Sequence, residues 1–145
     1  MTRIGVQDRL VPGATLSEKY EAARRFGFDA LELSERPAFD EARAAIRARI
    51  PVTAIAGGYR GWLIDPDPES IAAARADIAE LLDLAGELGT GIVVVPIWGR
   101  TRNLPGIATG RTRSEDEALF LEGLGPLAER AERSGARIFI EPLNR

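Results

Sequence analysis

Short apolar runs alternate with longer amphipathic segments along the whole chain. The apolar runs are typical of strands and lie at 4–6, 30–33, 52–56, 92–95 and 137–141. Between them, hydrophobic residues recur every three or four positions, which is the spacing of one buried helix face. Strands that alternate with helices pair in parallel through right-handed crossovers, so the pattern predicts an α/β fold.

Capping signals mark the ends of the predicted helices. Thr15 and Glu18 form a capping box before the first helix, and Asp67 with Pro68 begins the third. The second helix covers about 38–49, with its apolar positions on one face. Glycines that suit a left-handed cap follow the first, third and fourth helices: Gly27, Gly89 and Gly135.

The fourth helix has a more complicated sequence. Ser114 and Glu117 predict a capping box at its start, after a long loop over 96–113. Gly123, Gly125 and Pro126 lie in its middle and are expected to weaken or bend it.

Two architectures share this order of elements. One is a five-stranded doubly wound, flavodoxin-like sheet; the other is a (β/α)8 barrel of ~250 residues, of which 1–145 would be a single partial domain with roughly the first five strands and four helices. Only four residues follow the fifth strand, so no helix covers it. Residues 7–13, after the first strand, contain neither a phosphate-binding glycine-rich turn nor an aspartate cluster. Both observations favour the partial barrel.

Composition and charge exclude several classes of protein. The chain has no cysteine and no histidine, so it cannot by itself form a zinc finger, a Ser-His-Asp triad or a Cys-His dyad. Its net charge of −3 argues against a nucleic-acid partner. No apolar run approaches the ~18 residues of a membrane span, and the first residues do not resemble a signal peptide. We therefore expect a cytoplasmic protein without a membrane or nucleic-acid partner.

Candidate chemistry lies at the carboxyl ends of the strands, where parallel α/β folds bind ligands. The five ends offer, in chain order, Gln7 and Asp8, Glu32 and Ser34, residues 57–59, Pro96 and Trp98, and Glu141 and Asn144. Glu141 is the most informative, because a carboxylate that ends a buried strand needs a cation, a metal or a hydrogen-bonding substrate as its partner. Position alone is equally compatible with a structural pair to an arginine.

Several segments resemble one known family. Residues 140–145, Ile-Glu-Pro-Leu-Asn-Arg, are similar to the E-P-x-N-R segment at the fifth strand of the xylose-isomerase-like TIM-barrel superfamily. Residues 28–33 are similar to its second strand, and 67–96 to its third helix and fourth strand. The resemblance covers essentially the whole chain and rests on the order and spacing of these segments.

The resemblance implies an isomerase or epimerase that acts on a small sugar or sugar phosphate with the help of a divalent metal. A proton would move through an enediolate between carboxylates. Glu141 matches the glutamate that binds Mn²⁺, Mg²⁺ or Co²⁺ and serves as a catalytic acid/base residue. Glu32 matches a glutamate near the pocket, although a structural ion pair is an alternative role. Asn144 and Arg145 would support the site.

Loop residues supply further candidates for substrate binding. Three aromatic residues would either form a wall of a sugar pocket or pack over the barrel rim: Tyr59, Trp62 and Trp98. Four arginines in the loop before the fourth helix would either bind a phosphate or carboxylate or lie in solvent: Arg100, Arg102, Arg111 and Arg113.

The resemblance also implies that the chain is incomplete as an enzyme. The family's other metal ligands, an Asp, a His and a second Glu, come from later strands, so we expect this chain alone to be inactive and to bind no metal tightly. An endonuclease IV-like nuclease is an alternative, disfavoured by the acidic balance and by Gly57 and Gly58 where that family has histidine. A third reading is a non-catalytic half-barrel whose open edges are covered by a second copy or by a missing C-terminal half.

Overall fold

The computed structural model describes residues 4–35, 37–97 and 109–142, and its elements follow the predicted alternation. The strands are β1 (Gly5–Gln7), β2 (Ala30–Leu33), β3 (Val52–Ala56), β4 (Gly91–Val94) and β5 (Arg137–Ile140). The α-helices are α1 (Leu16–Arg25), α2 (Phe39–Ala48), α3 (Pro68–Glu87) and α4 (Arg113–Ser134), and a 3-10 turn, η1 (Asp8–Leu10), follows β1. Each predicted element is present, with its ends shifted by at most one or two residues.

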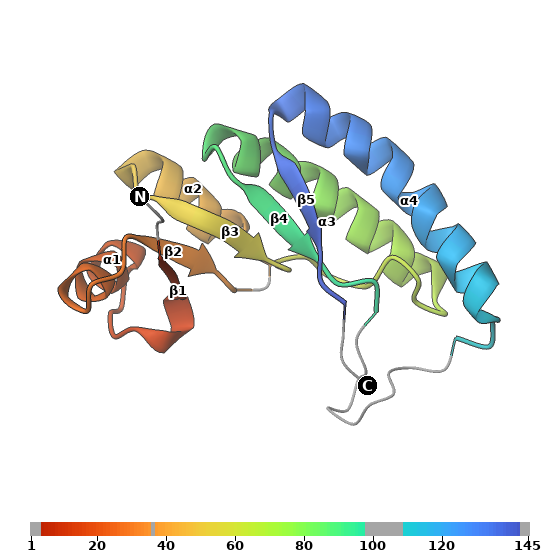
Figure 1. Cartoon of the computed structure of the whole chain (residues 1–145), viewed down its shortest axis with the longest axis horizontal. Coiled ribbons are helices and arrows are strands. Elements are labelled where there is room, and N and C mark those ends of the chain that lie inside the picture. The colour runs from red at the N-terminus through yellow and green to blue at the C-terminus, as the bar shows by residue number, and fades with distance from the viewer. Residues whose placement is uncertain (1–3, 36, 98–108, 143–145) are drawn as a thin grey trace.

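The strands form one parallel sheet in the order β1-β2-β3-β4-β5 (Figure 1). This sequential order decides between the two architectures, because a flavodoxin-like sheet has the order 2-1-3-4-5. Each crossover adds the next strand on the same side, as in a (β/α)8 barrel. The prediction of a partial barrel over the first five strands is therefore confirmed.

The hydrophobic core lies between the sheet and its helices. Along β2 the side chains alternate, so that Leu31 and Leu33 are fully buried under the helices while Glu32 is half-buried on the opposite face. The largest fully buried side chains continue this layer through the neighbouring strands and α3: Ile55, Ile78, Leu81, Leu82, Ile92 and Val94. The apolar stripe predicted for the third helix is thus part of the core.

β5 differs from the buried strand that the sequence predicts. Phe139 is 42% exposed and Ile140 is 50% exposed. The reason is its place at the edge of the sheet, where β4 pairs with one side and no described element pairs with the other. Phe139 and Ile140 therefore face solvent within the described part of the chain, whereas Ile138 packs against the core.

Side-chain caps explain where α1, α3 and α4 begin, whereas α2 has none. Thr15 and Glu18 form the predicted capping box of α1, and Asp67 accepts hydrogen bonds from the backbone of Glu69 and Ser70 at the start of α3. The predicted cap of α4 is wrong, because Thr112 and Glu115 form the capping box in place of Ser114 and Glu117. Both pairs satisfy the same S/T-x-x-E spacing.

Helices α3 and α4 pack at small residues. A Cβ atom added at Gly86 would lie 2.1 Å from the carbonyl oxygen of Ser134, so only glycine permits this approach. α4 remains one helix from Arg113 to Ser134, with Pro126 inside it. No helix within the described residues is both long and apolar enough to cross a membrane.

Candidate functional site

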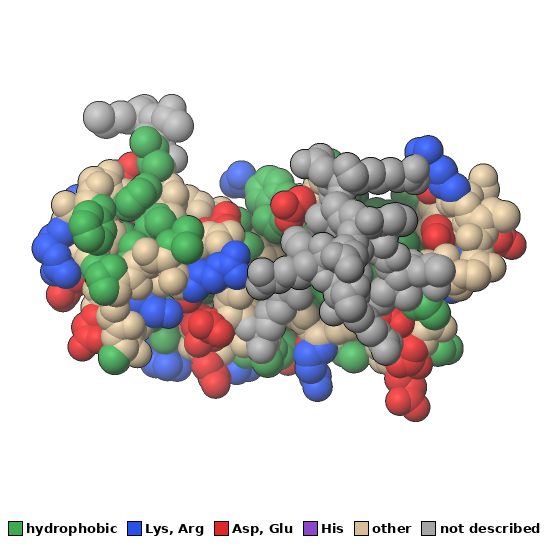
Figure 2. All heavy atoms as spheres, turned by 90° about the horizontal axis from the view of Figure 1, so that it is seen from below, with side chains coloured by type: hydrophobic (Ala, Val, Ile, Leu, Met, Phe, Trp, Pro, Cys, Tyr) green, Lys and Arg blue, Asp and Glu red, His purple; other side chains and the backbone are tan. Residues whose placement is uncertain are grey.

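The carboxyl ends of the five parallel strands lie at one end of the molecule, the lower side in Figure 1. Figure 2 looks onto this end and shows acidic, basic and hydrophobic side chains together. Parallel α/β folds bind ligands at this end because loops of several strands meet there. The sequence places its candidate residues at the same end.

Gln7 and Glu32 form a hydrogen-bonded pair at the ends of β1 and β2. They are partners in the strand register, and Nε2 of Gln7 donates to Oε1 of Glu32 over 2.7 Å. Oε1 of Gln7 in turn accepts from Nε of Arg9 over 2.9 Å. The described partner of Glu32 is thus the side-chain amide of Gln7. The alternative role that the sequence suggests for Glu32, a structural ion pair, would need a charged partner instead.

Asp8 is the fully buried carboxylate of this region. Its Oδ1 accepts from the backbone N–H and the hydroxyl of Ser34 over 3.0 and 2.6 Å, and its Oδ2 pairs with Nζ of Lys19 at 3.2 Å. These bonds join η1, α1 and the segment after β2. In the sequence, Asp8 and Ser34 stand out only as strand-end residues, and no local pattern relates either of them to Lys19.

The two described aromatic candidates lie in the loop after β3. Tyr59 is 2% exposed; its hydroxyl donates to the carbonyl oxygen of Val95 over 2.9 Å and accepts from the N–H of Val95 over 2.8 Å. Trp62 is half-buried and meets Tyr59 edge to face, with 6.2 Å between ring centroids. This packing gives Tyr59 a structural role at the end of β4; the contact of either ring with a substrate stays a prediction.

An ion pair holds the same loop to α3. Asp77 is buried, and it accepts from the backbone N–H, Nε and Nη2 of Arg60 over 2.9, 2.8 and 2.7 Å. The hydrogen bonds from the Arg60 side chain lower the pKa of Asp77 despite its burial. Sequence reasoning missed this pair, because no local pattern relates a loop arginine to a helix aspartate.

Arg111 and Arg113 each have a carboxylate partner within the described residues. Nε of Arg111 lies 2.7 Å from Oδ1 of Asp116, and its Nη2 donates to the carbonyl oxygen of Ile64. Arg113 pairs with Glu117, one turn along α4, over 2.7 Å. Arg111 therefore joins the loop to α4 and to Ile64, whereas the Arg113–Glu117 pair lies within α4 and is exposed. The anion-binding role that the sequence offers for them stays a prediction.

Glu141 follows directly after β5. Its backbone N–H donates to the carbonyl oxygen of Val94 over 3.0 Å, which continues the β4–β5 ladder by one residue. Its side chain is exposed, and no described residue forms a hydrogen bond or ion pair with the carboxylate. The other predicted site residues lie outside the described residues: Trp98, Arg100, Arg102, Asn144 and Arg145.

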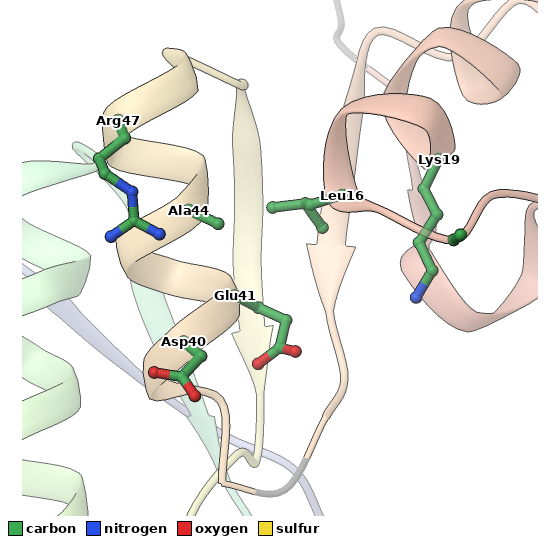
Figure 3. A pocket seen from close by; sticks show the side chains of 7 residues that line it. Leu16, Lys19, Asp40, Glu41, Ala44 and Arg47 are labelled. Atoms are coloured by element: carbon green, nitrogen blue, oxygen red, sulfur yellow. The ribbon is translucent and has the colours of Figure 1, made fainter.

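One pocket lies away from the strand ends, between α1 and α2 (Figure 3). Leu16 points toward α2, whereas Asp40 and Glu41 lie near the start of α2 and Arg47 near its end. The pocket has charges of both signs, and the ammonium group of one lining residue, Lys19, is already bound by Asp8. It does not share any of the strand-end candidates.

A comparison with models of known protein families identifies the family of this chain. A model of the xylose isomerase-like TIM barrel matches residues 20–145, which is most of the chain. The chain belongs to the xylose isomerase-like TIM-barrel family. Its sequential parallel sheet agrees with this membership.

Relatives of this TIM-barrel chain include sugar epimerases. It is 32% identical to the 3-dehydro-D-guloside 4-epimerase of Escherichia coli over 99% of its own length. The crystal structure of 3-keto-D-glucoside 4-epimerase from Escherichia coli matches all of it, with 31% identity and a TM-score of 0.84. An L-ribulose 3-epimerase structure matches all of it with 25% identity and a TM-score of 0.74. The chain spans about half the length of these relatives: 57% of the first two and 51% of the third.

Proposed function

We propose that this chain is the N-terminal half of a sugar epimerase whose substrate lies across the carboxyl ends of β1 to β5. The observation that carries the proposal is the similarity to a 3-dehydro-D-guloside 4-epimerase along almost the whole chain. The likeness in structure to a 3-keto-D-glucoside 4-epimerase, over the whole chain, supports the same proposal.

The proposed substrate is a glycoside with a ketone at C3, and the proposed reaction inverts C4. The C4–H bond lies next to the C3 carbonyl, so a base can remove this proton and leave an enolate, or an enediolate where C4 carries its hydroxyl. Return of a proton to the opposite face of C4 gives the epimer, without net oxidation or reduction. The reaction therefore needs a base, an acid and groups that bind sugar hydroxyls.

Glu141 is our proposed acid/base residue in this chain. It lies at the strand-end edge, its backbone is fixed by the bond to Val94, and its carboxylate is accessible to a substrate. Removal of a general base in such a role slows a reaction by typically 10²–10⁴-fold. Glu32 is proposed to accept a hydrogen bond from a sugar hydroxyl. The predicted contacts of Tyr59, Trp62, Trp98, Asn144, Arg145, Arg100 and Arg102 remain part of the proposal.

A divalent metal does not fit the described residues taken alone. No group of three or more Asp, Glu, His or Cys side chains in the described ranges lies close enough together to hold an ion. Hard cations such as Mg²⁺ need several oxygen ligands, and Glu141 is a single carboxylate. We therefore expect the isolated chain of 145 residues to bind Mn²⁺ only weakly and to show no turnover, which calorimetry and an epimerase assay check.

The test follows the proton at C4. The full-length protein is incubated with a 3-keto-glucoside in D₂O, and NMR detects both the C4 epimer and deuterium at C4. Glu141→Gln is expected to slow deuterium incorporation by about 10²-fold or more. Glu129→Gln, an exposed change on α4, is the matched control and should leave the rate unchanged. Unchanged exchange in Glu141→Gln would exclude it as the base, and no exchange in the wild type would exclude the epimerase.

A further inference from the structure

The donors and acceptors of the hydrogen bonds around Gln7 can be assigned in only one way. An arginine side chain can donate but not accept, so the amide oxygen of Gln7 must face Arg9, and its nitrogen must then face Glu32. Both contacts are short, at 2.9 and 2.7 Å. Arg9, Gln7 and Glu32 therefore form a polar chain in which each group orients the next.

The backbone on either side of this chain is fixed as well. Asp8, next to Gln7, is fully buried and binds both the N–H and the hydroxyl of Ser34, two residues after Glu32. Lys19 neutralises the buried carboxylate from α1. The ends of β1 and β2 are thus joined by two parallel connections, one on the solvent side and one in the interior.

The arrangement leaves Glu32 able to bind a further donor. Gln7 occupies Oε1, and no described residue donates to Oε2. A half-buried carboxylate held in one orientation accepts hydroxyl donors strongly, because the bond is charge-assisted and little rotamer freedom remains to be lost. Sugar hydroxyls are such donors.

We propose that Gln7 is a positioning residue, which fixes Glu32 so that its second oxygen accepts a hydrogen bond from a hydroxyl of the sugar. Gln7 acts through Glu32 and does not itself need to touch the substrate. The substrate part of this inference rests on the proposed function, whereas the positioning part concerns the described residues alone.

The positioning part is tested by NMR without any substrate. Gln7 is the only glutamine of the chain, so selective ¹⁵N-glutamine labelling gives a single pair of side-chain amide signals. Glu32→Leu, which removes the acceptor without adding a second glutamine, is expected to shift this pair, and Arg9→Met should shift it less. Glu21→Leu on α1 is the control and should leave the pair unchanged. An amide pair that does not respond to Glu32 overturns the inference.

The substrate part is tested by a double-mutant cycle in the full-length protein. Gln7→Leu and Glu32→Gln are each expected to raise KM about tenfold while kcat changes less than about threefold, and the double variant should be no worse than Glu32→Gln alone. The inference is overturned if the KM increases of the two single variants multiply in the double variant, or if Gln7→Leu leaves KM unchanged. A wild type without turnover overturns the proposed function and the sugar contact with it, but leaves the NMR result standing, so the two failures are distinguishable.

Discussion

Asp77 illustrates how single residues of this fold hold a loop in place. It comes from α3, is buried, and binds Arg60 in the loop after β3 through three hydrogen bonds. One of those donors is a backbone N–H, so the carboxylate fixes both the side chain and the path of the loop. The donors from the guanidinium are the main cause of the lowered pKa.

The lowered pKa makes the contribution of Asp77 to stability depend on pH. A carboxyl group with a lower pKa in the folded than in the unfolded state contributes fully above its unfolded pKa, about 4. The contribution is lost as the pH falls through the folded pKa. Asp77→Asn is therefore expected to reduce the free energy of unfolding by about 2 kcal/mol at pH 7 and by less at pH 3.

Urea unfolding at both pH values checks this expectation. The control is Asp40→Asn, because the Asp40 side chain is almost fully exposed and lies 3.7 Å from its only described cation, Arg43. The wild type keeps some pH dependence from the lowered pKa values of Glu18, Asp83 and Glu115. An Asp77→Asn variant whose loss of stability is the same at pH 3 and pH 7 would contradict the assignment.

At the residue scale, the sequence predicts positions better than partners. The positions of Glu32 and Glu141 near strand ends can be predicted, because the alternation of side chains along a strand is a local pattern. The bonds from Tyr59 to Val95 and from Lys19 to Asp8 join residues 36 and 11 positions apart, through loops whose conformation the local pattern does not specify. Such pairs can be identified only in the folded structure.

At the scale of elements, the start of α4 shows how two valid motifs compete. Thr112 with Glu115 and Ser114 with Glu117 both have capping-box spacing. With Thr112 as the cap, Glu117 is free to pair with Arg113, and Asp116 with Arg111. A helix that begins at Thr112 therefore leaves these charged side chains paired, which the spacing of the two motifs does not show.

The two motifs can be separated by mutation. Thr112→Ala removes the side chain that accepts from the N–H of Glu115, and we expect it to lower the free energy of unfolding by about 1 kcal/mol. Ser114→Ala changes an exposed residue inside the first turn and should alter stability by less than about 0.5 kcal/mol. Denaturant unfolding of both variants measures the difference, and equal losses would argue that α4 begins at both caps.

The contact between α3 and α4 gives a second prediction for elements. Gly86→Ala would place a methyl group against the backbone of Ser134, and we expect a loss of about 2 kcal/mol or more. Gly123→Ala is the control, since the added Cβ would meet only the flexible end of Arg75 at 3.3 Å and gains helix propensity. Thermal unfolding should rank Gly86→Ala well below Gly123→Ala; the reverse order would rule out the close approach.

At the scale of the whole molecule, the architecture was largely predictable. Periodicity gave the alternation of strands and helices, and the sequential order of the strands in the sheet then decided for the partial barrel. The exposure of β5 was not predicted, because an apolar run predicts a buried strand whether or not a neighbouring strand is present to cover it. Ile140 shows the difference, as it is as apolar as a core residue and half exposed.

The open edge predicts self-association of the isolated chain. Unpaired strand edges with exposed apolar residues pair with other chains. We expect the average mass of the 145-residue chain in sedimentation experiments to rise with concentration, and Ile140→Lys to suppress this rise. Leu121→Lys is the control, since Leu121 is 67% exposed on α4, away from the edge. Association that persists unchanged in Ile140→Lys would place the contact elsewhere.

The sequential order of the strands also has a consequence for synthesis on the ribosome. Each of β2 to β5 pairs with the strand that precedes it in the chain, so its partner has already been made when it emerges. The helices add to the core in the same order, and α3 and its strand can pack before α4 exists. The sheet can therefore grow one strand at a time from the N-terminus, as domains begin to fold during translation. β5 is the last described strand to be added, and its open edge is where such growth would continue.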